Sequence, residues 1–367
     1  MSLWIHGLGT AVPSPTMTQQ EAVELAQQVI RPTDQQTRLL KALYRRTGVK
    51  NRHTALPHRT ALDWVPAPAG AAVDEAAAST MDGLGPSTSQ RMRFYSEHAP
   101  PLAISAASHA LEQATLDPSE ITHLITVTCT GFTAPGVDTA LITALGLRPT
   151  TERIQVGFMG CHGAINGLRV ARSLALADPH ACPLLCAVEL CSLHFRFGWD
   201  EDRVVANALF ADGAAALATS GRQAADGAWS VVATGSCLIP DSEDAMTWRI
   251  GDHGFEMTLS ARVPELVGRH LRPWLAGWLE EHGLSIESVG SWAVHPGGPR
   301  ILSAVSESLA LPPDATAVSR DILAQFGNMS SPTVLFILDR LRQAQAPRPC
   351  VALGFGPGMF AEAALLT

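Results

Sequence analysis

The chain has 367 residues, 46% of them hydrophobic and 16% charged, and a formal net charge of −8. This length allows two domain-sized cores, the composition excludes a disordered chain, and the acidic balance argues against nucleic-acid binding. Seven cysteines without framework spacing argue against a disulfide scaffold, and the start of the chain carries no secretory leader pattern. We therefore expect a globular protein of the cytoplasm. We expect no membrane partner, because no stretch nears the roughly 20 apolar residues of a membrane helix.

The first unusual segment is basic. Residues 38–53, RLLKALYRRTGVKNRH, hold six Lys and Arg side chains, Arg46 and Arg52 among them, and no acidic residue. Such a patch on an acidic protein could bind a phosphorylated ligand or could be a solvated helix face, and both interpretations stay open. The next segment, residues 55–90, is rich in Pro, Ala, Gly and Ser. It predicts an insertion or a loop packed over the core, with a possible short helix around VDEAAAS.

The rest of the chain predicts two similar halves. Residues 100–131 indicate a helix, a short connector and a buried strand that ends at Cys129, and residues 263–298 repeat this order and end at His295. Helices that alternate with nearly continuous apolar strands are typical of an α/β protein whose strands are buried on both faces. We place the boundary in the turn-rich residues 221–227, which divides the chain into 1–224 and 225–367.

Residues 239–260, IPDSEDAMTWRIGDHGFEMTLS, interrupt the second half. A polar loop there leads into the alternating pattern of strands. We expect a hairpin that could form the wall of a pocket.

Cys161 is the most informative residue. It stands in VGFMGCHGAINGLRVARSLALA, where an apolar run meets Gly160, the cysteine and then an amphipathic helix. Helix N-termini favour negative charge, so this position predicts a stabilised thiolate able to attack a carbonyl or thioester carbon. The alternative is a buried structural cysteine, which is common among free cysteines.

Two further residues occupy comparable positions. His295 follows the apolar strand in WAVHPGG, and Asn328 precedes a helix in FGNMSSPTVLFIL. Such ends cluster at one edge of a parallel sheet, so we expect both near Cys161. The two could hold an enolate oxygen after a malonyl thioester loses CO₂, while Cys161 carries the acyl group. Taken singly, His295 could instead be a core histidine and Asn328 a helix N-cap.

Several motifs occur together in a known order. They are GLGTAVP, RMRFYSEHAPPLA, CTGFTAPGVD, ALFADGAAA, HPGGPRIL, GNMSSPTVLFIL and GFGPG. With the GC turn, they make nearly the whole chain resemble the type III polyketide synthases, the chalcone-synthase-like branch of the thiolase superfamily, in a bacterial form. The resemblance implies a duplicated, five-layer αβαβα thiolase fold and a homodimer. It also implies CoA thioesters as substrates, with no cofactor and no metal.

The same resemblance assigns binding residues. It places two gatekeepers at Phe210 and Met257, and a basic residue that grips CoA phosphates at Arg46. The remaining positions lie in matching motifs and would shape the substrate cavity (Cys129, Cys191, His194, Trp248, Gly356 and Pro357) or contact CoA (Gly298 and Arg300).

Departures from the plant pattern narrow the expected chemistry. Cys129 and Cys191 replace threonines, Met257 replaces an aromatic residue, and Trp248 stands where plant enzymes have glycine. A less polar cavity favours fatty acyl starters, extended with malonyl-CoA and cyclised to a pyrone or a phenolic product. Two alternatives stay open: an initiating ketoacyl synthase that condenses once onto an acyl carrier protein, and a non-catalytic subunit. The latter would be expected to lack the nucleophile.

Overall fold

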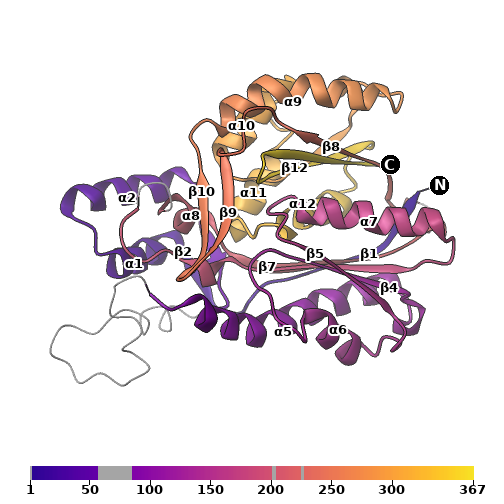
Figure 1. The fold of residues 1–367 in the computed structure, drawn as a ribbon. Helices are drawn as coiled ribbons and strands as arrows, with labels where there is room; N and C mark the ends of the chain where they lie inside the picture. Colours follow the sequence, from indigo (N-terminus) through magenta and orange to yellow (C-terminus); the bar gives the residue numbers. More distant parts are fainter. Residues whose placement is uncertain (1, 57–84, 201–203, 225–226) are drawn as a thin grey trace.

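The computed structural model describes residues 2–56, 85–200, 204–224 and 227–367 (Figure 1). Within these ranges nine strands form one sheet. Five strands come from the first half, in the order β1 (Leu3–Ala11), β7 (Asp212–Ser220), β6 (Pro183–Leu190), β4 (His123–Thr128) and β5 (Glu152–Gly157). Four come from the second half, in the order β8 (Ser230–Leu238), β13 (Phe360–Leu366), β12 (Cys350–Gly356) and β11 (Ser291–Val294).

The two sets of strands share one pattern. In the first, β1 pairs with β7 and β7 with β6 antiparallel, and β6 then pairs with β4 parallel. In the second, β8, β13, β12 and β11 repeat these directions in the same order. Among the described residues, the two sets of strands pair with each other at Leu3–Val231 and Trp4–Ser230 of β1 and β8. The predicted duplication is therefore confirmed: the nine-stranded sheet consists of two similar parts, called the first and second sheet below, which are joined where β1 pairs with β8.

Helices fill the three layers around these sheets. Between the sheets lie α7 (Gly163–Ala177) and α12 (Pro332–Gln343), each in contact with strands of both halves. The outer face of the first sheet is covered by α5 (Thr88–Ala114) and α6 (Val137–Leu145), and that of the second by α9 (Val263–Glu280) and α10 (Pro299–Leu309) (Figure 1). This is the expected five-layer αβαβα arrangement.

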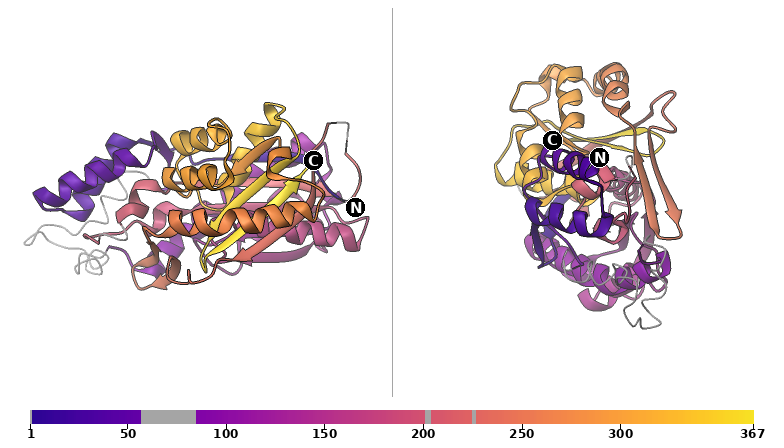
Figure 2. Two further views of the ribbon diagram at one scale, coloured as in Figure 1. Left: turned by 90° about the horizontal axis from the view of Figure 1, so that it is seen from above. Right: turned by 90° about the vertical axis from the view of Figure 1, so that its left-hand side faces the viewer.

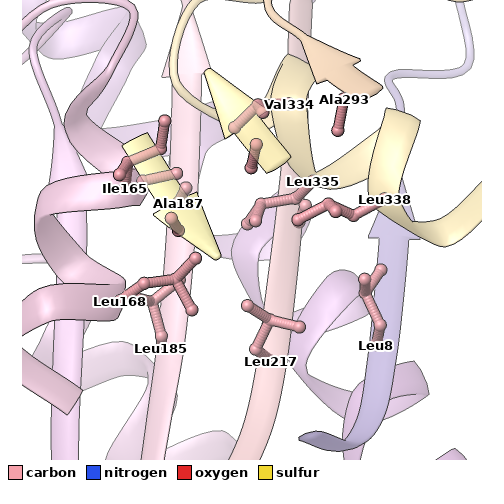
Figure 3. Close-up of a cluster of buried hydrophobic side chains, with 14 of the residues drawn as sticks. Leu8, Ile165, Leu168, Leu185, Ala187, Leu217, Ala293, Val334, Leu335 and Leu338 are labelled. Carbon is pink, nitrogen blue, oxygen red and sulfur yellow. The ribbon is translucent and has the colours of Figure 1, made fainter. Parts of the chain in front are cut away.

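Apolar side chains hold the middle layer. Ile165 and Leu168 of α7 and Leu335 of α12 point into one cluster with Leu185 and Leu217 of the first sheet (Figure 3). Each of these side chains is fully buried. Because α12 is apolar on nearly every side from Pro332 to Leu338, it can be covered on all sides, as a central helix must be.

A smaller group of elements gathers at the end of the molecule opposite the two termini (Figure 2). It contains β2 (Thr16–Thr18), α1 (Gln19–Ile30), α2 (Asp34–Arg46), β3 (Asn51–His53) and α8 (Val204–Leu209). Most of the basic segment lies on α2, but Arg52 does not belong to that surface. Arg52 is buried, and its guanidinium donates to the backbone oxygens of Ala208 at 2.7 Å and Asn207 at 2.9 Å.

Two expectations about the intervening segments have clear outcomes. The expected hairpin exists as β9 (Met246–Gly251) and β10 (Gly254–Leu259). The helix expected from Pro100 begins earlier, at Thr88, because Ser87 and Gln90 form a capping box and the helix accommodates Pro100 and Pro101 internally. The possible helix around VDEAAAS lies outside the described residues. The remaining elements are α11 (Ala317–Phe326), η1 (Pro118–Glu120), η2 (Cys191–His194) and η3 (Ile286–Ser288).

We predict that Leu335→Ala lowers the free energy of unfolding by about 2–5 kcal/mol, because the lost side chain leaves a cavity between the sheets. Urea denaturation followed by circular dichroism measures this loss. The exposed Arg340, on the same helix, is the control, and Arg340→Ala should change stability by no more than about 0.5 kcal/mol. Equal losses for the two variants would contradict the central position of Leu335.

Candidate active site

Cys161 lies in the turn between β5 and α7. Gly160 has φ +79°, and a Cβ there would lie 2.5 Å from Cδ of Pro357. The turn therefore needs glycine on both conformational and steric grounds. The amide of Gly163 donates to the backbone oxygen of Gly160 at 2.9 Å, which closes the turn and starts α7 directly after the nucleophile candidate.

His295 and Asn328 reach the same place from the second half. The amide of His295, after β11, donates to the Leu353 oxygen at 2.8 Å. Asn328 lies between α11 and α12, and its Oδ1 accepts from the Ser330 amide at 2.8 Å, which leaves the amide nitrogen of its side chain free for the sulfur. The side chains of Asn328 and Ser330 both hydrogen-bond Cys161. Cys161, His295 and Asn328 line one small cavity, so the structure brings the three predicted catalytic residues together.

Burial disfavours the charged forms of Cys161 and His295. It raises the pKa of Cys161 to about 11 and lowers the pKa of His295 to about 3. The prediction that the helix N-terminus stabilises a thiolate at Cys161 is thus wrong for the site without substrate. Burial raises the pKa of the thiol by more than the hydrogen bonds to the sulfur lower it. A thiolate and an imidazolium can form here only together, by transfer of the Cys161 proton to His295, since each ion then has a partner.

A larger pocket opens from Cys161. Its space amounts to about 1300 Å³, including the part open to solvent. The predicted cavity residues that line it are Cys129, Cys191, His194, Phe210, Trp248, Met257 and Pro357. Gly356 does not line it. Instead, Gly356 packs against the ring of His162, which lies within 2.5 Å of where a Cβ would stand.

The far end of this pocket is apolar and was not expected. Met17 of β2 and Ala22, Leu25 and Val29 of α1 line it, and all four are buried. The spacing of the three α1 residues marks one face of a helix and could have shown that α1 covers something apolar. It could not have shown that the covered space is a cavity.

The hairpin forms the opposite wall. Its tip bonds to the start of α5, and two further sets of contacts hold its strands. Nε1 of Trp248 donates to the Cys129 oxygen at 2.7 Å. His194 bonds the Thr130 oxygen through Nε2 at 2.7 Å and the Phe255 amide through Nδ1 at 2.9 Å. Since Nδ1 accepts from an amide, the His194 ring carries its proton on Nε2 and is neutral.

Glu189 is a second feature that the sequence did not reveal. This fully buried carboxyl group accepts from the Cys129 amide at 3.0 Å, the Thr130 hydroxyl at 2.7 Å and the Ser331 hydroxyl at 2.6 Å. Burial raises its pKa. It ties the loop after β4 to the start of α12, behind Cys161. Its only signal was an acidic residue within an apolar strand.

The expected CoA contacts lie outside this pocket. Arg46 is exposed at the end of α2, and Arg300 lies in a separate hollow between α9 and α10 with Glu265 and Glu307. Gly298 has φ +149° and precedes α10. Gly48 lies against Pro299, so the end of α2 and the start of α10 are neighbours. The roles of Arg46, Gly298 and Arg300 stay predictions.

The comparisons with known proteins agree with this geometry. A family model for the N-terminal domain of chalcone and stilbene synthases matches residues 3–222, and one for their C-terminal domain matches residues 230–367. The chain belongs to the chalcone and stilbene synthase family. It is a type III polyketide synthase with the thiolase fold and hence an acyltransferase.

Individual relatives cover the whole chain. The alpha-pyrone synthesis polyketide synthase-like Pks18 of Mycobacterium tuberculosis is 33% identical over 98% of this chain and 90% of its own. The 1,3,6,8-tetrahydroxynaphthalene synthase of Streptomyces peucetius subsp. caesius is 35% identical over 99% and 92%. The crystal structure of PKS-I from the brown alga Ectocarpus siliculosus is 31% identical, with a TM-score of 0.90 over 100% of this chain and 98% of that one.

His194, which is neutral and bonded to the hairpin, predicts that the protein loses stability in acid. Burial lowers the pKa of His194 from 6.5 to about 3, so below pH 6.5 the unfolded chain binds a proton that the folded chain does not. Its contribution to stability is complete above pH 6.5 and falls by about 1.4 kcal/mol per pH unit below it. We expect His194→Gln to flatten the loss of unfolding free energy between pH 6.5 and 5 in urea titrations. The control is the exposed His180, where His180→Gln should leave the slope unchanged.

Proposed function

We propose that this protein loads an acyl group from a CoA thioester onto Cys161, extends it with malonyl-CoA by decarboxylative Claisen condensation, and releases a cyclised product. The observation that carries the proposal is that one cavity is lined by Cys161, His295 and Asn328 and adjoins a large apolar pocket. A sulfur nucleophile next to two hydrogen-bond donors supplies both parts of the reaction, the acyl carrier and the site for an enolate oxygen.

The steps follow from the chemistry of these side chains. The Cys161 proton moves to His295, the sulfur attacks the acyl thioester, and CoA leaves as a thiol. Malonyl-CoA then loses CO₂, and N–H groups of His295 and Asn328 hold the enolate oxygen that forms. The enolate carbon attacks the acyl group, and the sulfur of Cys161 leaves. One such donor is typically worth about 10²–10³ in rate.

The pocket favours an apolar, fatty acyl starter. Buried apolar side chains of α1 form its far end, and Cys129 and Cys191 are less polar than hydroxyl side chains. Relatives that resemble this chain over nearly their full length are named for a pyrone and for a phenolic product, and we propose a product of one of these two classes.

The proposed partners are an acyl-CoA starter, malonyl-CoA and a second copy of this chain in a homodimer. Exposed basic side chains on α2, at Arg38, Lys41, Arg45 and Arg46, suit the phosphates of CoA. Among the described helices, none is long and apolar enough to cross a membrane. The cytoplasmic location and the division into 1–224 and 225–367 stay predictions.

The direct test is incubation of the purified protein with malonyl-CoA and a panel of acyl-CoAs from acetyl to long fatty chains, read by mass spectrometry. We expect products that contain one starter and at least two malonyl-derived units, with preference for long chains. A single condensation that requires an acyl carrier protein would contradict the proposal and favour an initiating ketoacyl synthase.

We predict that Cys161→Ala abolishes product formation, because no acyl group can be carried, while slow decarboxylation of malonyl-CoA continues at His295 and Asn328. Release of ¹⁴CO₂ from labelled malonyl-CoA measures the second activity. The double variant Cys161→Ala with Asn328→Ala should lower that rate by about 10²-fold or more. Equal rates in both variants would mean that Asn328 does not hold the enolate.

We predict that replacement of Trp248 by a smaller residue changes the length of the product. Its indole fills the space beside Cys129 and is fixed by the hydrogen bond from Nε1, so its removal opens a lobe next to the reacting centre. We expect Trp248→Gly to shift the product profile, measured by mass spectrometry with one fixed starter. Trp248→Phe, which keeps most of the volume, is the control. An unchanged profile for the glycine variant would contradict the assignment of Trp248 to the cavity wall.

A further inference from the structure

His162 follows the nucleophile directly, yet its ring does not line the pocket. His162 is 3% exposed and occupies the N-cap position of α7, but its side chain makes no capping hydrogen bond. Its Nδ1 lies 2.6 Å from Oδ1 of Asn166, one helical turn onward. Because Oδ1 can only accept, Nδ1 carries the proton, and Nε2 of the neutral ring presents a lone pair.

The ring stacks on the inner face of β12. A Cβ on Gly354 would lie 3.1 Å from Cβ of His162, and one on Gly356 would lie 2.5 Å from its Nε2. The two glycines of this strand therefore form a slot that only the backbone can line, and the imidazole of His162 occupies it.

His295 lies on the same face, next to this slot. Val294 pairs with Leu353 in the parallel ladder of β11 and β12, so the following residues, His295 and Gly354, lie side by side. Val294 and Leu353 belong to the outer core under α9, and side chains alternate along a strand, so His295 points inward. Gly354 thus separates the two histidines without a side chain of its own.

Both rings are incompletely paired. Among the described residues, Nε2 of His162 and both ring nitrogens of His295 have no hydrogen-bond partner, although all are buried. A charge on His162 would also disfavour a charge on His295, so the rings interact electrostatically. An imidazolium has two N–H donors, and the second one on His295 needs an acceptor once the Cys161 proton has arrived.

We propose that His162 is a positioning residue for the condensation: its Nε2 lone pair accepts, directly or through one water, the N–H that His295 turns away from Cys161. The proton moves from Sγ of Cys161 to the free ring nitrogen of His295, which gives a thiolate and an imidazolium with no net change of charge. Asn166 keeps His162 in the tautomer that can accept. This role builds on the proposed function but concerns only the Cys161–His295 pair.

The charged groups around His162 allow this role. On α7 and β13, Arg169 and Glu362 form an ion pair, and Ser236 donates to Glu362 at 2.7 Å, so their charges offset one another. Burial lowers the pKa of His162, with Asn166 and Glu362 raising it and Arg169 lowering it. The ring is neutral near pH 7 and becomes a cation only in acid, where it would oppose the charge of His295.

The test uses three variants of the full chain. His162→Phe keeps the ring volume without an acceptor, His162→Gln keeps an amide that can accept, and Asn166→Asp favours a doubly protonated His162 that cannot accept. The first measurement is the rate of Cys161 alkylation by iodoacetamide from pH 6 to 11, followed on the Cys161 peptide by mass spectrometry. The second is kcat and KM for malonyl-CoA, and thermal unfolding shows which variants fold.

We expect His162→Phe and Asn166→Asp to move the rise of alkylation to higher pH by about one unit, and to lower kcat roughly ten-fold or more with little change in KM. His162→Gln should stay within about three-fold of the parent. Unchanged alkylation profiles in both His162→Phe and Asn166→Asp would overturn the proposal, as would equal losses in the phenylalanine and glutamine variants. Asn166→Asp only replaces the side-chain NH₂ group with an oxygen. Its alkylation profile therefore tests the proposal if His162→Phe does not fold. Alkylation needs no substrate, so its outcome is independent of the proposed function.

Discussion

The packing of α7 against α12 between the two sheets is the constraint on which the site depends. The two helices occupy equivalent places in the two halves, and each begins at the same cavity. Cys161 precedes α7, and Asn328 precedes α12. The ends of β4 and β11 are equivalent in the same way, and they carry Cys129 and His295. Duplication therefore brings four strand and helix ends close together, so that two segments far apart in the sequence supply the proposed reaction centre.

Burial gives this centre its chemical character. Cys161 and His295 are buried, which disfavours either ion alone, whereas transfer of the proton from the sulfur to the imidazole would create two opposite charges that stabilise each other. The same burial strengthens a hydrogen bond to an enolate oxygen.

Much of this arrangement can be predicted from the sequence, because it follows from periodic patterns. The helix–connector–strand order before Cys129 and His295 shows the duplication, and glycine before Cys161 shows the turn. The parts that could not be predicted depend on tertiary contacts. Arg52 is one of six basic residues in the segment 38–53, and the backbone oxygens of α8 that it contacts explain its burial. Glu189 and the α1 wall of the pocket are likewise defined by what packs against them. The direction in which the pKa of Cys161 shifts depends on how deeply the fold buries the thiol, which the sequence does not give.

The seam between the halves has a further consequence. In the part of the chain that the structure describes, two residue pairs join β1 to β8. This short seam suggests that the halves could separate, but the middle layer contradicts this. Strands β1 and β7 of the first half support α12 of the second, while β8 and β13 of the second support α7 of the first. Each half thus packs one of its helices against the sheet of the other half. We therefore expect the chain to unfold as one cooperative unit, wherever the division between the halves lies.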